Sequence, residues 1–173
     1  RGEQTMRLED ANVLLFTRTM GLGGTENVVL QICNFLYPKV NNLIVCSCGG
    51  IHVSKLEQIG IKHYSIPDIA GKNPRSMMKI FFELKKIIKR ERINVIHTHH
   101  RMAAFYVAAS GFYRKRLFIN TSHNTFHNKK ALTKYAYKHA SLIACGQMVK
   151  ENLISTFKIP SCKITVIHNS VKP

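Results

Sequence analysis

The sequence is short of acidic residues: nine Asp and Glu stand against 26 Lys and Arg, which gives a net charge of +17 at pH 7. Between Arg92 and Lys150 there are ten Lys or Arg and no acid at all. Solubility does not require so uneven a charge, whereas a polyanionic partner would be attracted and steered by it. We therefore expect a partner with negative charge: nucleic acid, an anionic membrane surface or a phosphorylated substrate.

Two other scarcities narrow the class of protein. The chain has only five prolines and 45% hydrophobic residues, so we expect one globular domain with a sizeable core. No apolar run approaches the about 20 residues that span a bilayer, and residues 1–10 lack the apolar centre of a secretory signal. We expect a cytoplasmic domain over residues 11–171, with residues 1–10 a leader or a remnant of cloning.

The five cysteines are odd in number, and most lie in apolar runs where a reduced thiol packs as a small hydrophobic group. This distribution argues against a disulfide framework. Cys46 and Cys48 lie near His52, but no second pair of ligands follows at zinc-finger spacing. We therefore expect no metal site there.

Strand-length apolar runs alternate along the chain with segments whose apolar residues have helical spacing. Several runs are apolar on both faces, as the strands of a helix-covered parallel sheet must be. The pattern predicts an α/β fold, a Rossmann-like, doubly wound and mainly parallel sheet of about six to seven strands with helices on both faces. The expected strands are 12–17, 42–47, 62–66, 94–98, 117–122, 141–145 and 163–168; the expected helices are 25–36, 53–59, 75–91, 102–112, 130–138 and 147–157.

The turn "GLGGTE", residues 21–26, lies between the first expected strand and its helix, where such sheets bind ligands. Exposed helix-start amides suit a phosphate there, and the alternative is a tight turn that needs positive φ. A dinucleotide fingerprint would have a small residue in place of Glu26 and an acid in place of Cys46 to Cys48. A P-loop would end in Gly-Lys-Ser/Thr, so both of these phosphate sites are disfavoured.

Two segments carry a family resemblance. "GLGGTENVVLQICNFL" resembles the Gly-Gly-x-Glu turn and first helix of family 4 glycosyltransferases, which have the two-domain GT-B fold. "SLIACGQMVKENLISTFKIPSCKITVIHNSV" is similar to the segment that closes the family's first domain at an Asn-Gly-Val hinge. Together they bracket the chain from Asn12 to Val171. The departures are Gly146 and Gln147 in place of Ser-Glu, Lys158 in place of a common glycine, and Ser170 in place of the hinge glycine.

The resemblance implies the acceptor-binding half of a retaining enzyme, which ends at the interdomain hinge. The second domain, which grips the nucleotide sugar, has no counterpart in this sequence, so the fragment alone should be inactive. The implied donor is a UDP- or GDP-sugar, with no further cofactor. The implied acceptor is a lipid-linked or phosphorylated glycan of cell-envelope polysaccharide or glycolipid synthesis.

The resemblance also assigns site residues. Gly23, Gly24 and Thr25 would face the donor, and His123 matches the family's histidine after the fifth strand, a catalytic position. His97 and His99 share one strand face, with His99 near the carboxyl end, while His100 points away. The spacing of His123 and His127 would allow zinc binding, but no acidic or thiolate residue lies nearby in the sequence as a further ligand. We therefore expect no metal. The expected acceptor-binding residues are His99, Arg101, His127, Lys129 and Lys130.

Basic residues beside aromatics fit docking on anionic headgroups, and such docking would place the protein on the inner face of the membrane. The alternatives are a solvated face or, for Lys129 and Lys130, a phosphate on the acceptor itself. The expected membrane-binding residues are Lys85, Lys86, Lys89, Arg90, Arg114, Lys115, Arg116, Lys134 and Lys138.

Two other classes of function remain open. The charge also suits a nucleic-acid-binding α/β domain, but no known recognition motif is present and the glycine turn would be unexplained, so we expect no nucleic acid partner. A non-catalytic module that recruits a synthase to the membrane is the second alternative.

Overall fold

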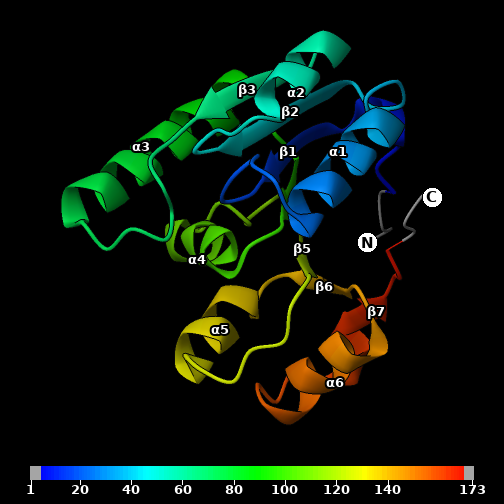
Figure 1. Ribbon diagram of the computed structural model, residues 1–173, viewed down its shortest axis with the longest axis vertical. Helices are drawn as coiled ribbons and strands as arrows, with labels where there is room; N and C mark the ends of the chain where they lie inside the picture. The colour runs from blue at the N-terminus through cyan, green and yellow to red at the C-terminus, as the bar shows by residue number, and fades with distance from the viewer. Residues whose placement is uncertain (1–4, 170–173) are drawn as a thin grey trace.

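Seven parallel strands form one sheet in the order β3-β2-β1-β4-β5-β6-β7 (Figure 1). The computed structural model describes residues 5–169; residues 1–4, part of the expected leader, and the expected hinge at Ser170 and Val171 lie outside the described residues. The order and the parallel pairing of the strands confirm the doubly wound parallel sheet expected from the sequence. The strands are β1 Asn12–Phe16, β2 Asn42–Ser47, β3 Lys62–Ser65, β4 Val95–Thr98, β5 Leu117–Ser122, β6 Ser141–Ala144 and β7 Ile164–Val166.

The expected helices are also confirmed, with small differences at their ends. The expected helix 102–112 stops at Ser110 because Gly111 adopts a left-handed conformation with φ 72°. Leu8–Asp10, which the sequence assigned to a leader, form the 3-10 helix η1. The helices are α1 Gly24–Leu36, α2 Val53–Ile59, α3 Pro74–Arg90, α4 Arg101–Ser110, α5 Lys130–Tyr137 and α6 Gln147–Ser155, with the 3-10 helix η2 at Ser161–Lys163.

The hydrophobic core has two parts, and each contains residues of different helices. Val29 and Leu30 of α1 belong to a cluster with residues of β1, β2 and α2. Ile80 of α3 and Leu153 of α6 belong to a larger cluster, which also includes buried residues of α4 and α5. Figure 1 shows α3 and α1 on opposite sides of strands β1 to β3. Apolar side chains on both faces of the strands fill these two layers, as a doubly wound sheet requires.

The longest helix in residues 5–169 is α3, with 17 residues. The Asn73 side chain accepts a hydrogen bond from the Arg75 amide, and Pro74 occupies the first helical position, so both residues favour a helix start here. On the outer surface of α3, the side chains of Met78 and Phe82 are 61% and 59% exposed. No helix within these described residues is long and apolar enough to cross a membrane.

Asparagine side chains fix the register between β1 and β4, the two neighbouring strands at which the strand order in the sheet reverses. The Asn12 amide donates to Asn94 Oδ1 at 2.7 Å, and Asn94 Nδ2 donates to the Asp10 carbonyl at 3.0 Å. Asn12 Nδ2 donates to the Arg92 carbonyl at 2.9 Å. With these contacts Phe16 lies opposite Thr98, so the residues that follow β1 and β4 emerge side by side. Ligands of open α/β sheets bind at this kind of switch point.

We predict that the N94A substitution lowers the free energy of unfolding by about 1–3 kcal/mol, because it leaves the Asn12 amide without its acceptor. Urea denaturation measures the change. The matched control is N34A, which removes a side chain that donates only to the Leu30 carbonyl in α1. A loss for N94A no larger than that for N34A would contradict the proposed role of Asn94.

Candidate functional site

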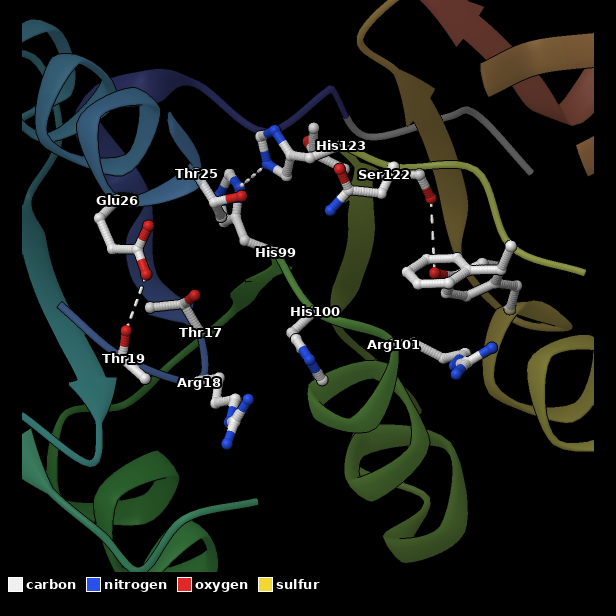
Figure 2. A pocket seen from close by; sticks show the side chains of 14 residues that line it. Thr17, Arg18, Thr19, Thr25, Glu26, His99, His100, Arg101, Ser122 and His123 are labelled. Atoms are coloured by element: carbon white, nitrogen blue, oxygen red, sulfur yellow. Dashed lines mark hydrogen bonds between the residues drawn. The ribbon is translucent and has the colours of Figure 1, made fainter. Parts of the chain in front are cut away.

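A cavity of about 210 Å³ lies at the carboxyl ends of β1, β4 and β5 (Figure 2). Its wall is formed by three segments that follow these strands, 17–19, 99–101 and 121–124, together with the start of α1. Figure 2 shows their side chains around one common space. We call this cavity the candidate site; its other lining residues are Thr25, Glu26, Phe126 and Tyr137.

The glycine turn makes room for a carboxylate. Gly21, Gly23 and Gly24 do not adopt the left-handed backbone conformation, so the tight-turn alternative does not explain them. Gly23 is extended, with φ 168°, and a Cβ at this position would collide with the Glu26 carboxylate. A Cβ on Gly24 would meet no atom within 4 Å. Gly23 therefore lets the Glu26 carboxylate approach the turn, and a side chain at this position would displace that carboxylate, whereas Gly24 keeps the first turn of α1 open.

Glu26 is held at the start of α1. Its Oε1 accepts a hydrogen bond from Thr19 Oγ1 at 2.7 Å, and Thr19 Oγ1 accepts one from the Gly21 amide at 3.3 Å. The N-cap residue of α1 is Gly23, which has no side chain to accept hydrogen bonds from the helix. Amides of the first turn are therefore available for a ligand. The Glu26 carboxylate repels a phosphate but is a good acceptor for sugar hydroxyls. The turn is thus suited to a sugar beside Glu26, and to a phosphate only at the amides of the first helical turn.

A second loop, residues 48–52, fixes the position of the turn. The Met20 amide donates to the Gly49 carbonyl and the His52 amide donates to the Met20 carbonyl, both at 2.9 Å. Gly50 has φ 149°, and a Cβ there would collide with the Met20 backbone. Only glycine allows this close approach. The "CSCGG" segment is therefore explained by backbone packing, and its thiols are free.

Three imidazoles form a connected row behind the turn. His99 Nδ1 lies 3.1 Å from His123 Nε2, and the His97 and His99 ring centroids are 4.1 Å apart. His123 Nδ1 lies 3.2 Å from Cys145 Sγ. The expectation that His97 and His99 share a strand face is confirmed. His100, expected to point away, also lines the candidate site, because β4 ends at Thr98 and its alternation stops there.

The row has a preferred arrangement of protons. His99 is 3% exposed, and its Nε2 has no hydrogen-bond partner within the described residues. An unpartnered buried lone pair costs less than an unpartnered N–H, so the proton belongs on His99 Nδ1 and is donated to His123 Nε2. His123 Nδ1–H then donates to Cys145 Sγ. In this arrangement His123 has no free lone pair and does not act as a general base.

Desolvation keeps these imidazoles neutral at pH 7. It lowers the pKa of His97 to about 4, with a further contribution from His123. It lowers the pKa of His99 well below the usual value, and it lowers the pKa of His123 against an opposing contribution from Glu26. The pKa of His100 falls to about 4 through desolvation and the charges of Arg18 and Arg101. The histidine wall therefore offers hydrogen bonds without charge.

Two guanidinium groups supply the charge of the candidate site. Arg18 pairs with both carboxylate oxygens of Asp68, at 3.0 and 2.9 Å. Arg101 donates to the Asn128 carbonyl at 3.3 Å and lies over the Phe126 ring, 4.5 Å from its centroid. Both side chains are thereby held in place, which suits the recognition of an anionic group.

An adjoining groove of about 460 Å³ shares His100, Arg101 and Phe126 with the candidate site. Apolar side chains alternate there with cationic ones. We call it the amphipathic groove; its other notable lining residues are Met77, Met102, Leu132, Lys72 and Lys129. The combination suits a molecule that has an anionic group next to a hydrocarbon or sugar face.

Some of the remaining residues predicted from the sequence lie at the candidate site, and others lie away from it. Gly24 and Gly23 lie at the α1 start with Thr25, which lines the candidate site, and His99 and His123 form its wall. Exposed His127 and Lys130 line neither the candidate site nor the amphipathic groove. Arg116 donates to the backbone carbonyls of residues 93, 112 and 114, so it is anchored within the fold. The other predicted membrane-binding residues are exposed: Lys85, Lys86, Lys89, Arg90, Arg114, Lys115, Lys134 and Lys138.

Sequence reasoning missed several lining residues. Thr17, Arg18 and Thr19 directly follow the first apolar strand, and Ser122 ends the fifth. The signal that would have found them is their position, polar residues at the carboxyl end of a parallel strand. Tyr137 gave no such signal, because it reaches the site from α5, where its hydroxyl accepts a hydrogen bond from Ser122 Oγ at 3.4 Å.

Comparison with known proteins identifies the family and the fold of this chain. The model of Glycosyltransferase Family 4 matches residues 22–173, so the chain belongs to this family. The fold is that of one half of a GT-B glycosyltransferase. A search of curated proteins finds no match.

Solved structures show the same fold in longer proteins. A glycosyltransferase from Rickettsia africae ESF-5 has a TM-score of 0.80 at 23% identity, over 94% of this chain and 44% of that one. The lipopolysaccharide outer core galactosyltransferase WaaB has a TM-score of 0.71 at 16% identity, over 92% and 46%. Anabaena Alr3699/HepE in complex with UDP-glucose has a TM-score of 0.68 at 18% identity, over 92% and 44%. The chain thus spans less than half the length of these relatives.

The buried imidazoles should make stability depend on pH. A histidine whose pKa is lowered by folding binds protons more readily in the unfolded chain, so its contribution to stability is complete above about pH 6.5 and is lost toward the folded pKa. The pKa of both His97 and His100 is about 4. We therefore expect the free energy of unfolding to fall by at least about 2 kcal/mol between about pH 7 and pH 4.5, measured by urea denaturation.

The H97Q variant is the control for this pH dependence. Gln keeps a hydrogen-bonding group opposite Thr121 Oγ1, the partner of His97 Nε2, but removes the titration. The variant should lose less stability than the parent over the same interval.

NMR of the parent protein gives a second measurement. The carbon-bound ring protons of His97 should keep their chemical shifts down to about pH 5. Titration of these protons near pH 6.5 would contradict the buried neutral row.

Proposed function

We propose that this chain is the acceptor-binding half of a retaining glycosyltransferase. It would transfer a sugar from a nucleotide donor to a lipid-linked or phosphorylated acceptor in cell-envelope polysaccharide or glycolipid synthesis. The observation that supports this most directly is the amphipathic groove, which adjoins the candidate site and shares Arg101 with it. Family membership supports the transfer, and the groove supports the class of acceptor.

The donor, a UDP- or GDP-sugar, would present its diphosphate and transferred sugar to the start of α1. Amides of Gly24 and Thr25 are oriented for an anion, and Glu26 lies beside them as an acceptor for sugar hydroxyls. The Anabaena neighbour was solved in complex with UDP-glucose, which supports a donor of this kind. A separate domain would grip the nucleotide, so we expect no sugar transfer by the 173-residue chain alone.

His123 would contact the transferred sugar or the acceptor hydroxyl as a neutral imidazole. Its hydrogen bonds to His99 and Cys145 fix the ring, so its contribution is position and shape rather than proton abstraction. Glu26 is the one carboxylate among the residues that line the candidate site, and it is held by Thr19. The catalytic contribution of this half is therefore orientation of the two substrates.

The acceptor would lie in the amphipathic groove. Arg101 and Lys129 would bind a phosphate, while Met77, Met102 and Leu132 would pack against a hydrocarbon chain. WaaB, a structural neighbour, is a lipopolysaccharide outer core galactosyltransferase, which supports an envelope glycan as the acceptor. Lys130 and His127 would contribute only at the groove's outer edge.

Membrane docking would bring the protein to such an acceptor. On α3 the exposed Met78 and Phe82 lie on the same side of the helix, four residues apart, with Lys85, Lys86 and Lys89 beside them. This mixture of apolar and cationic groups suits an anionic bilayer interface. We propose a cytoplasmic location, peripheral on the inner face of the membrane, with Arg90, Arg114, Lys115, Lys134 and Lys138 as further basic contacts.

Binding of dodecyl phosphate, at concentrations below its micelle formation, tests the acceptor class. Lys129 has φ 52°, so K129G removes its charge and also relieves a strained backbone. We expect K129G to weaken binding about five-fold, as the loss of one charge-assisted contact predicts. Isothermal titration calorimetry measures the affinity.

The matched control is K115G, because Lys115 has φ 60° and lies outside the groove. It should change the affinity less than two-fold, which is about the error of such a comparison. An uncharged ligand of equal chain length, dodecyl maltoside, should bind more weakly than dodecyl phosphate. Equal losses in K129G and K115G, or tighter binding of short duplex DNA than of anionic vesicles, would overturn the proposed acceptor.

A further inference from the structure

The residues with left-handed backbone that are not glycine are all basic in the described part of the chain. They are Arg92, Lys115, Lys129 and Lys158, with φ between 50° and 60°. A side chain in this region is strained, and glycine is the usual residue there. Lys158 is the most informative of the four, because it occupies a position where the family resemblance predicts a glycine.

The backbone requires a left-handed residue at position 158. The Lys158 amide donates to the Ile154 carbonyl at 3.1 Å, and the Ile159 amide donates to the Leu153 carbonyl at 3.2 Å. These two bonds end α6 in a left-handed helix cap. Glycine would fit this cap without strain. The chain instead places an ammonium group there, and such a cost is often linked to function.

The Lys158 side chain lines a second cavity, of about 410 Å³. Three other lysines line the same cavity: Lys134 of α5, Lys138 directly after α5, and Lys163 at the end of η2. Ile159 and Pro160 provide an apolar side. We call it the lysine pocket.

Its charges are not neutralised by the protein. None of its four lysines takes part in a salt bridge within residues 5–169. Glu151 is the only acidic residue after Glu91 in the sequence, and it bonds to Gln147. Lys163 is half-buried, and its Nζ donates to the Lys138 carbonyl, so one wall of the pocket is fixed.

The lysine pocket lies away from the candidate site. Lys138 precedes β6 and Lys163 precedes β7, so these residues are at the amino edge of the parallel sheet, whereas the candidate site is at the carboxyl edge. Tyr137, which lines both cavities, separates them. The pKa of nearby His139 is lowered by desolvation and, to a lesser extent, by the charges of Lys138, Lys163 and Arg114.

We propose that the lysine pocket binds a small ligand that carries a diphosphate or two phosphate groups, at a site separate from the transfer site. Four lysine side chains around one hollow bring several positive charges to a ligand with several negative ones, and the apolar side formed by Ile159 and Pro160 suits the non-ionic part of such a ligand. The assignment does not depend on the proposed glycosyl transfer. It gives Lys158 a role that its strained backbone alone leaves unexplained.

Calorimetric titration of the 173-residue chain with inorganic pyrophosphate tests the site. K158G removes one charge and restores the unstrained residue, so the variant should be at least as stable as the parent. We expect K158G to weaken pyrophosphate binding about five-fold, and K115G, which removes an equal charge and similar strain elsewhere, to weaken it less than two-fold.

Vesicles of equal parts phosphatidylcholine and phosphatidylglycerol distinguish the source of the phosphate. If K158G weakens pyrophosphate binding but not vesicle binding, the site takes a soluble ligand; if it weakens both, the site takes a lipid headgroup. Both results support the proposal. Equal losses of pyrophosphate binding in K158G and K115G, or no loss of pyrophosphate binding in K158G, would overturn it, because the attraction would then come from net charge alone.

Discussion

Parallel pairing of β1 with β4 is the contact on which the candidate site depends. The hydrogen bonds between Asn12 and Asn94 set the register at the amino edge, and this register brings segments 17–19 and 99–101 together at the carboxyl edge. β5 then adds His123 next to His99. The turn before α1 faces this row because the loop 48–52 holds it from the other side. Each wall of the site is thus positioned by backbone geometry before any ligand arrives.

Electrostatics divides this surface into regions with different chemistry. Burial keeps His99 and His123, which line the candidate site, and the neighbouring His97 neutral, so one wall of the site offers shape and hydrogen bonds without charge. Glu26 provides a carboxylate, and the fixed guanidinium groups of Arg18 and Arg101 provide positive charge nearby. A sugar with its phosphates needs all three kinds of group. The scarcity of acidic residues elsewhere leaves further lysines free to meet anionic partners.

The fold was predictable because its signal is local. Every expected strand and helix is present, since two-sided apolar runs and helical spacing are written within each segment. The site was predictable only in part. His99 and His123 were expected from their places after strands, whereas the Arg18–Asp68 pair, the amphipathic groove and the reach of Tyr137 depend on contacts between distant segments. The close approach of the Glu26 carboxylate to Gly23 likewise depends on where the Glu26 side chain lies.

The central claim is that the cavity at the carboxyl edge is where sugar transfer takes place. The most direct test is the transfer rate of H123A in a protein that joins this chain to a donor-binding half, with H139A, at the opposite edge, as the matched control. The account predicts a fall in kcat of about 10²-fold for H123A, because the fixed imidazole that orients the substrates is lost, and little change for H139A. A rate for H123A equal to that of H139A, with both variants folded, would contradict it.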